Sequence, residues 1–212
     1  MGELRRDGDR LMVSKGGGVV AGDIAILVGA YLIGSFPSNY LTAKLFKGVD
    51  LLRTGSGNVG GMNTIRNVGA LPGLVGGAMD ILKAVLATWL GLAYGSAPWV
   101  ASAAAVLVVV GHNWMVWLRF RGGKGLGASV GALAMLAPWS LPWMLGLIVV
   151  ATLILRDTMM GVAVACAFLP AILWPVKGGP MWALVGALLA LAVLGKLAED
   201  IKAYLGGRRR FV

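Results

Sequence analysis

The feature that most constrains this chain is a series of long apolar runs separated by short polar breaks. A run that approaches about 20 residues can cross a bilayer as a helix. Hydrophobic residues make up 58% of the chain and charged residues 13%, so a water-soluble domain would lack the polar residues needed to cover its surface. No ten-residue alternation of polar and apolar residues recurs, which argues against a membrane β-barrel. The sequence therefore predicts an all-α integral membrane protein.

The breaks between the runs divide the chain into about seven transmembrane helices. The expected spans cover residues 23–45, 70–95, 97–118, 125–138, 140–155, 158–176 and 180–198. Pro138 and Pro142 separate the fourth span from the fifth, and both of these are short for a full crossing. They are expected to form either a tilted pair or a re-entrant hairpin.

These spans are expected to build one membrane domain over residues 23–205. A polar N-terminal tail, residues 1–22, precedes it, and a basic C-terminal tail, residues 206–212, follows it. Because the N-terminal tail carries charges of both signs, it is expected either to be disordered or to be an over-long start before Met12.

The positive charges indicate the orientation of the chain. Lysine and arginine gather at alternate connections, which in membrane proteins is typical of the cytoplasmic side. Two glycine-rich loops and the C-terminus are therefore predicted to be cytoplasmic. The net charge of +10 follows from these flanking residues and does not indicate nucleic acid. Cys166 and His112 are the single cysteine and histidine, so neither a disulfide nor a bound metal is expected, and no cofactor is indicated.

The first glycine-rich loop reads RTGSGNVGGMNTIRNVG, residues 53–69. Its glycines allow backbone N–H groups to converge on an anion, and an arginine adds a planar cation suited to phosphate. A tight turn between two membrane helices is the alternative. The candidate binding residues here are Gly55, Ser56, Gly57, Asn58, Asn63 and Arg66.

The second loop lies in GHNWMVWLRFRGGKGLG, residues 111–127, and repeats the pattern around a lysine. Its candidate residues are His112, Asn113, Gly122, Gly123, Lys124 and Gly125. His112 and Asn113 end an apolar run, where they either face the site or cap the helix. Arg119 and Arg121 flank the lysine and either bind an anion or reach toward lipid headgroups.

Polar residues inside the spans are candidates as well, because they are costly in a bilayer. Ser35 lies in GSFPSNY of the first span, and Asp80 and Lys83 can pair on one face of the second span. This pair is either structural or supports the site. No nucleophile motif such as G-x-S-x-G is present, so a covalent acyl-enzyme is not expected.

The two loops, together with DILKA at residues 80–84, resemble the bacterial acyl-phosphate:glycerol-3-phosphate acyltransferases over residues 24–135. The resemblance implies a multi-pass enzyme of the bacterial inner membrane that acts as a monomer and needs no cofactor. It implies acyl transfer from acyl phosphate to the sn-1 hydroxyl of glycerol 3-phosphate, giving lysophosphatidic acid in phospholipid synthesis. It further implies catalytic roles for Ser56, Asn58 and Lys124, and a contact between Arg66 and the acceptor phosphate.

The chain departs from the family pattern at three notable positions. Met62 stands where a threonine is usual, Leu197 where a functional histidine is expected, and Asp200 where an asparagine is expected. A carboxylate near phosphate requires a neighbouring cation, for which the C-terminal candidates are Lys196, Lys202 and residues 208–210. Two alternatives therefore stay open: a paralogue that acylates another acceptor or binds phospholipid intermediates without turnover, and a transporter of phosphorylated solutes.

Overall fold

The computed structural model describes residues 3–7, 10–14, 21–177 and 179–207. From residue 21 onward it is helical, with short connections. The helices are α1 (Ala21–Gly34), α2 (Ser38–Lys47), α3 (Gly61–Asn67), α4 (Ala70–Tyr94), α5 (Pro98–Asn113), α6 (Leu126–Leu136), α7 (Ser140–Leu155), α8 (Thr158–Lys177) and α9 (Pro180–Leu205). Two 3-10 turns, η1 (Leu51–Arg53) and η2 (Val116–Leu118), lie in the loops.

The N-terminal tail contains two short strands, and the expectation of a disordered tail or an over-long start stays a prediction. Strand β1 (Glu3–Asp7) pairs antiparallel with β2 (Arg10–Ser14), with Glu3 opposite Ser14 and Asp7 opposite Arg10. Residues 1–2, 8–9, 15–20 and 208–212 lie outside the described residues.

Five segments among the described residues are long and apolar enough to cross a membrane. They are Ala21–Lys47, Ala70–Tyr94, Pro98–Leu118, Thr158–Pro175 and Pro180–Leu205. Helices α6 and α7 are shorter, with 11 and 16 residues, as the prolines between them suggested. The all-helical membrane fold is thus confirmed, whereas the number of seven spans stays a prediction.

The first predicted span is interrupted. Helix α1 ends at Gly34 and α2 begins at Ser38, so that the chain bends at Ser35, Phe36 and Pro37. Proline lacks a backbone N–H and disfavours helical geometry in the residue before it. The break frees the Phe36 carbonyl oxygen, which accepts a hydrogen bond from Lys83 Nζ at 2.8 Å.

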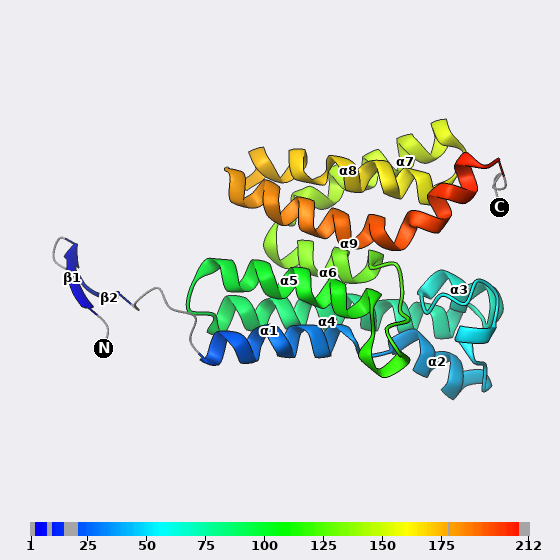
Figure 1. Cartoon of the computed structure of the whole chain (residues 1–212), viewed down its shortest axis with the longest axis horizontal. Coiled ribbons are helices and arrows are strands. Elements are labelled where there is room, and N and C mark those ends of the chain that lie inside the picture. The colour runs from blue at the N-terminus through cyan, green and yellow to red at the C-terminus, as the bar shows by residue number, and fades with distance from the viewer. Residues whose placement is uncertain (1–2, 8–9, 15–20, 178, 208–212) are drawn as a thin grey trace.

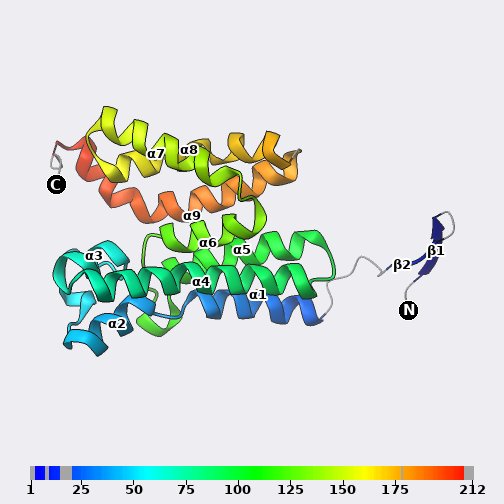
Figure 2. The same ribbon diagram turned by 180° about the vertical axis from the view of Figure 1, so that it is seen from behind.

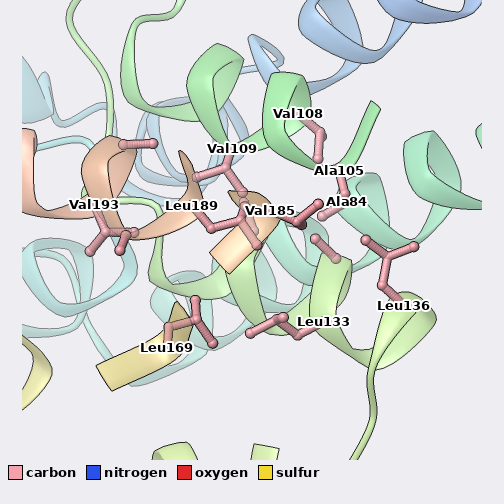
Figure 3. Close-up of a cluster of buried hydrophobic side chains, with 14 of the residues drawn as sticks. Ala84, Ala105, Val108, Val109, Leu133, Leu136, Leu169, Val185, Leu189 and Val193 are labelled. Atoms are coloured by element: carbon pink, nitrogen blue, oxygen red, sulfur yellow. The ribbon is translucent and has the colours of Figure 1, made fainter. Parts of the chain in front are cut away.

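The helices form two groups that lie side by side. Helices α7, α8 and α9 make one group, and α1, α4, α5 and α6 make the other (Figure 1). The short helices α2 and α3 lie at the same end of the molecule as the C-terminal end of α9, as both views show (Figure 2). Buried alanine, valine and leucine side chains from α4, α5, α6, α8 and α9 fill the space between the groups (Figure 3).

Small residues allow the helices to approach closely, as is usual in membranes. A Cβ atom on Gly34 of α1 would overlap the Val108 carbonyl of α5, and one on Gly111 would overlap the Tyr31 carbonyl of α1. At the opposite end of α1, the buried Asp23 carboxylate accepts hydrogen bonds from the Ser96 backbone N–H, at 2.9 Å, and the Ser96 hydroxyl. Helix α1 is therefore fixed against α5 near one end and against the α4–α5 turn at the other.

The close contact at Gly34 can be tested with Gly34→Ala. The added methyl group overlaps backbone atoms that cannot move aside, so we expect a loss of about 1–3 kcal/mol of stability. The thermal midpoint of the detergent-solubilised protein should fall by several degrees. Gly29→Ala is the matched control, because the same helix leaves open space at that position. Equal midpoints for the two variants would contradict the assigned packing.

Candidate active site

Both glycine-rich loops border one open cavity of about 920 Å³ at the end of the molecule that holds α2 and α3. Helix α4, the α7–α8 corner and the last turns of α9 complete its wall. The polar and charged residues among its lining are Ser56, Asn58, Asn63, Arg66, Asn67, Asp80, His112, Arg121, Lys124, Asp157, Thr158, Lys196, Glu199 and Asp200. The two loops, far apart in sequence, therefore line the same cavity.

The first loop is folded around the Asn63 side chain. Asn63 Nδ2 donates to the carbonyl oxygens of Thr54, at 3.1 Å, and Asn58, at 2.9 Å. Its Oδ1 accepts from the Ser56 backbone N–H at 3.2 Å and from Asn67 Nδ2 at 2.9 Å. These four bonds use the full capacity of the amide. Asn63 lies on the cavity wall, where its amide shapes the loop, and its predicted contact with substrate stays a prediction.

Two glycines of this loop have backbone geometry that favours glycine. Gly55 has φ of 62° and Gly57 has φ of 69°, and a Cβ on Gly55 would also overlap the Asn63 and Asn67 side chains. Both glycines line the cavity. The loop is therefore more than a tight turn between two helices. Its hydrogen bonds fix its backbone, and the loop borders an open cavity.

Three predicted residues of the first loop present side chains that are available to a ligand. Ser56 and Arg66 are exposed on the cavity wall and Asn58 is half-buried. Among the described residues, the Ser56 hydroxyl and the Arg66 guanidinium make no hydrogen bond or ion pair within the protein. Helix α3, which the sequence did not predict, carries Arg66.

The second loop closes tightly over the end of α5. The Gly123 backbone N–H donates to the His112 carbonyl oxygen at 3.0 Å, and a Cβ on Gly123 would overlap the His112 imidazole. A Cβ on Gly122 would overlap the His112 carbonyl in the same way. The two glycines therefore permit a close approach that holds the buried histidine in place.

Four predicted binding residues do not line the cavity: Ser35, Asn113, Gly123 and Gly125. The Ser35 hydroxyl donates to the Gly111 carbonyl oxygen at 3.4 Å, and Asn113 Nδ2 donates to the Ala192 carbonyl oxygen of α9 at 2.6 Å. Gly125 has φ of 81° and packs on Asn113. In a membrane protein, polar groups between helices have no water to bond, so they form hydrogen bonds with one another. These residues hold the helices that carry the site.

A buried polar cluster around Asp80 forms part of the cavity wall. Asp80 Oδ1 lies 2.8 Å from Lys83 Nζ and 3.3 Å from His112 Nδ1. Asp80 Oδ2 accepts a hydrogen bond from Asn39 Nδ2 at 2.6 Å, and Asn39 Oδ1 accepts one from the Thr64 hydroxyl at 3.2 Å. The predicted Asp80–Lys83 pair is therefore present. It belongs to a cluster that joins α2, α3, α4 and α5.

The charge of Asp200 is offset by a residue outside the C-terminal region. Its Oδ2 lies 2.7 Å from Nζ of Lys124 in the second loop. Of the cations considered from the sequence, Lys202 pairs with Glu199 at 3.0 Å, and residues 208–210 lie outside the described residues. The ion pair connects the second loop with α9 across the cavity.

The other two departures from the family pattern have different environments. Leu197 is fully buried in the hydrophobic core and does not line the cavity, whereas Met62 is exposed on the cavity wall. A histidine at 197 would lie in an apolar environment in this structure. Leu197 therefore contributes to the packing of the core. Met62 instead changes the surface of the cavity wall.

The α7–α8 corner was missed by the sequence analysis. Asp157, Thr158 and Met159 line the cavity opposite the first loop. Asp157 Oδ1 accepts from the backbone N–H groups of Met159, at 2.8 Å, and Met160, at 3.0 Å, which is the ordinary role of a helix N-cap. No local signal distinguishes this corner from any other cap, because its position at the cavity depends on tertiary structure alone.

Comparisons with known proteins agree with this geometry. The family model for glycerol-3-phosphate acyltransferase matches residues 24–207. A glycerol-3-phosphate acyltransferase of Thermus thermophilus is 36% identical over 186 residues, which cover 85% of this chain and 90% of that protein. Glycerol-3-phosphate acyltransferase 2 of Moorella thermoacetica is 44% identical over 144 residues, which cover 68% of this chain and 74% of the relative.

The fold of this chain is also similar to that of two solved structures. Crystal structures of PlsY, an integral membrane glycerol 3-phosphate acyltransferase, are known in a glycerol 3-phosphate form and a lysophosphatidic acid form. Each superimposes with a TM-score of 0.81 at 26% identity, covering 91% of this chain and 96% of the other. With the family model matched across the whole helical domain, this chain belongs to the glycerol-3-phosphate acyltransferase family.

Proposed function

We propose that this protein transfers an acyl chain from acyl phosphate to the sn-1 hydroxyl of glycerol 3-phosphate, releasing lysophosphatidic acid and inorganic phosphate. The observation that carries the proposal is the single cavity where two glycine-rich loops present cations beside apolar helices. Both substrates are anions, and one of them carries a lipid chain. The family membership and the two liganded PlsY structures support the same acceptor and product.

In this proposal Arg66 binds the phosphate of glycerol 3-phosphate. A guanidinium group can donate two parallel hydrogen bonds to phosphate oxygens. Arg66 lies on α3, close in sequence to Ser56 and Asn58, which are candidates to contact the reacting groups. Lys124 supports the binding of phosphate from the second loop, and its contact with Asp200 holds it at the cavity in the absence of substrate.

The chemical step needs no covalent enzyme intermediate. Acyl phosphate is a mixed anhydride, so the acceptor hydroxyl can attack its carbonyl carbon directly. The new ester C–O bond forms, the bond from the carbonyl carbon to the phosphate oxygen breaks, and the hydroxyl proton passes to a phosphate oxygen. The protein then contributes by orienting the substrates and stabilising the developing negative charge.

We further propose that the protein lies in the bacterial inner membrane as a monomer, with the cavity facing the cytoplasm. The loops that carry the cations and the C-terminal end of α9 lie at one end of the helices, and positive charge favours the cytoplasmic side.

An acyltransferase with a different acceptor is the second candidate, because Met62 and Asp200 alter the cavity wall. The decisive experiment supplies purified protein with acyl phosphate and glycerol 3-phosphate, and then with a panel of other hydroxyl acceptors. We expect lysophosphatidic acid as the main product. Product from another acceptor alone would favour the second candidate, and no product from any acceptor would favour a binding protein.

The assignment of Arg66 is tested with Arg66→Lys. Lysine keeps the charge but loses the forked geometry, so the KM for glycerol 3-phosphate should rise about tenfold. The KM for acyl phosphate should change by less than about threefold. Steady-state kinetics with each substrate varied in turn gives both values. Equal changes in the two constants would count against a specific contact with the acceptor.

The role of the second loop is tested with Gly123→Val. The branched side chain would displace the His112 imidazole from its place against Asp80, so turnover should fall about 100-fold while membrane insertion is preserved. Gly146→Val in α7 is the control, because open space surrounds that glycine. Normal turnover of Gly123→Val would show that the loop is only a connector.

The charge of Asp200 is tested with Asp200→Asn. Removing the carboxylate leaves Lys124 free for substrate phosphate, so the KM for glycerol 3-phosphate should fall about fivefold or more. The thermal midpoint, measured in parallel, separates this effect from a loss of folded protein. If activity is abolished in a folded variant, Asp200 is itself a working group, and an acceptor other than glycerol 3-phosphate becomes the better assignment.

A further inference from the structure

Lys196 of α9 lies on the cavity wall, in a setting that differs from those of the other cations there. The residue is half-buried, and its ammonium group lies 5.3 Å from the centroid of the Trp114 ring. Trp114 directly follows α5 and precedes the second loop. The lysine of one helix is thus held against an aromatic ring of another.

An aromatic face attracts a cation without cancelling its charge. Lys124 and Lys202 instead contact carboxylates, at 2.7 Å and 3.0 Å. Within the described part of the chain, Lys196 makes no ion pair and no hydrogen bond. Its positive charge therefore remains available to an anion that enters the cavity.

The backbone of Trp114, whose ring contacts Lys196, is held by two hydrogen bonds. The Trp114 backbone N–H donates to the Val110 carbonyl oxygen at 2.9 Å, which continues the hydrogen bonding of α5. The Trp114 carbonyl oxygen accepts a hydrogen bond from the Tyr31 hydroxyl of α1 at 2.8 Å. The Trp114 side chain is half-buried and packs against the hydrophobic core, so the ring limits the positions that the lysine side chain can take, which lowers the entropic cost of binding an anion.

The depth of Lys196 distinguishes it from Arg66. Arg66 is exposed on the short helix α3, where a small, water-soluble acceptor can reach it. Lys196 belongs to a segment, Pro180–Leu205, that is long and apolar enough to span the membrane. A donor whose acyl chain stays in lipid can bring its phosphate to the part of the cavity wall that such a segment forms.

We propose that Lys196 binds the phosphate group of the acyl phosphate donor and that Trp114 positions its ammonium group. This inference rests on the proposed function and adds a donor contact that comes from the C-terminal helix. The same group then holds the phosphate as it leaves, because the negative charge on it increases when the bond to the carbonyl carbon breaks.

The central test is Lys196→Gln, which removes the charge but keeps a polar side chain. We expect the KM for acyl phosphate to rise about tenfold or more, because a charge-assisted contact is lost. The inhibition constant of inorganic phosphate, a product that occupies the same place, should rise in parallel. The KM for glycerol 3-phosphate should stay within about twofold, and Lys196→Arg should restore most of the donor affinity.

Two further variants separate a binding role from a structural one. Lys202→Gln removes the same charge from an exposed position of the same helix and should leave all three constants unchanged. Trp114→Phe keeps an aromatic face and should change the KM for acyl phosphate little, whereas Trp114→Leu should raise it severalfold. If Lys196→Gln behaves like Lys202→Gln, or raises the KM for glycerol 3-phosphate instead, the inference is overturned.

Calorimetric titration of the purified proteins with inorganic phosphate gives a readout without turnover. Lys196→Gln should bind phosphate about tenfold more weakly than the unmodified protein. This loss in a protein that acylates no glycerol 3-phosphate would refute the proposed function but keep the phosphate contact. Normal acyl transfer with unchanged phosphate binding and donor KM in Lys196→Gln would refute the contact and keep the function.

Discussion

The arrangement of the cavity depends on one buried carboxylate, that of Asp80. Lys83, His112 and Asn39 contact it, and they come from α4, α5 and α2. A charge in the membrane interior is costly unless it is paired and hydrogen-bonded, and removing one member of a buried pair costs about 3–5 kcal/mol. The cluster therefore favours one arrangement of these helices, in which the ends that carry the loops meet.

The loops acquire their shape from that arrangement. Thr64 connects the first loop to the cluster through Asn39, and Gly123 fits the second loop against the His112 ring. Within the first loop, Asn63 replaces the regular hydrogen bonding that a helix would supply. Much of the polar sequence in these loops thus serves to hold the backbone still, which leaves Ser56, Asn58 and Arg66 free to face a ligand.

Sequence predicted the membrane helices, both loops and the Asp80–Lys83 pair, because each depends on hydropathy or on spacing along one helix. It could not separate side chains that are available to a ligand from those that hold the protein together: Asn63 and Asn113 have the same side chain as Asn58, yet their amides bond to the protein. Sequence reasoning also did not predict contacts between residues that lie far apart in the chain. The contact of Asp200 with Lys124, and the burial of Leu197 one helical turn earlier, follow from how α9 packs on α5.

The cations that line the cavity differ in their exposure to solvent, and the two substrates of the proposed reaction differ in their solubility. Arg66 is exposed at the outer edge, while Lys124 and Lys196 are half-buried. Water weakens a contact with phosphate at the edge more than one within the wall. If Arg66 and Lys196 bind the two substrates as proposed, a soluble acceptor exchanges quickly at Arg66, whereas the donor phosphate is held where the surroundings strengthen charge interactions. In the proposed reaction, the acceptor thus reaches the cavity from water, while the acyl chain of the donor stays in lipid.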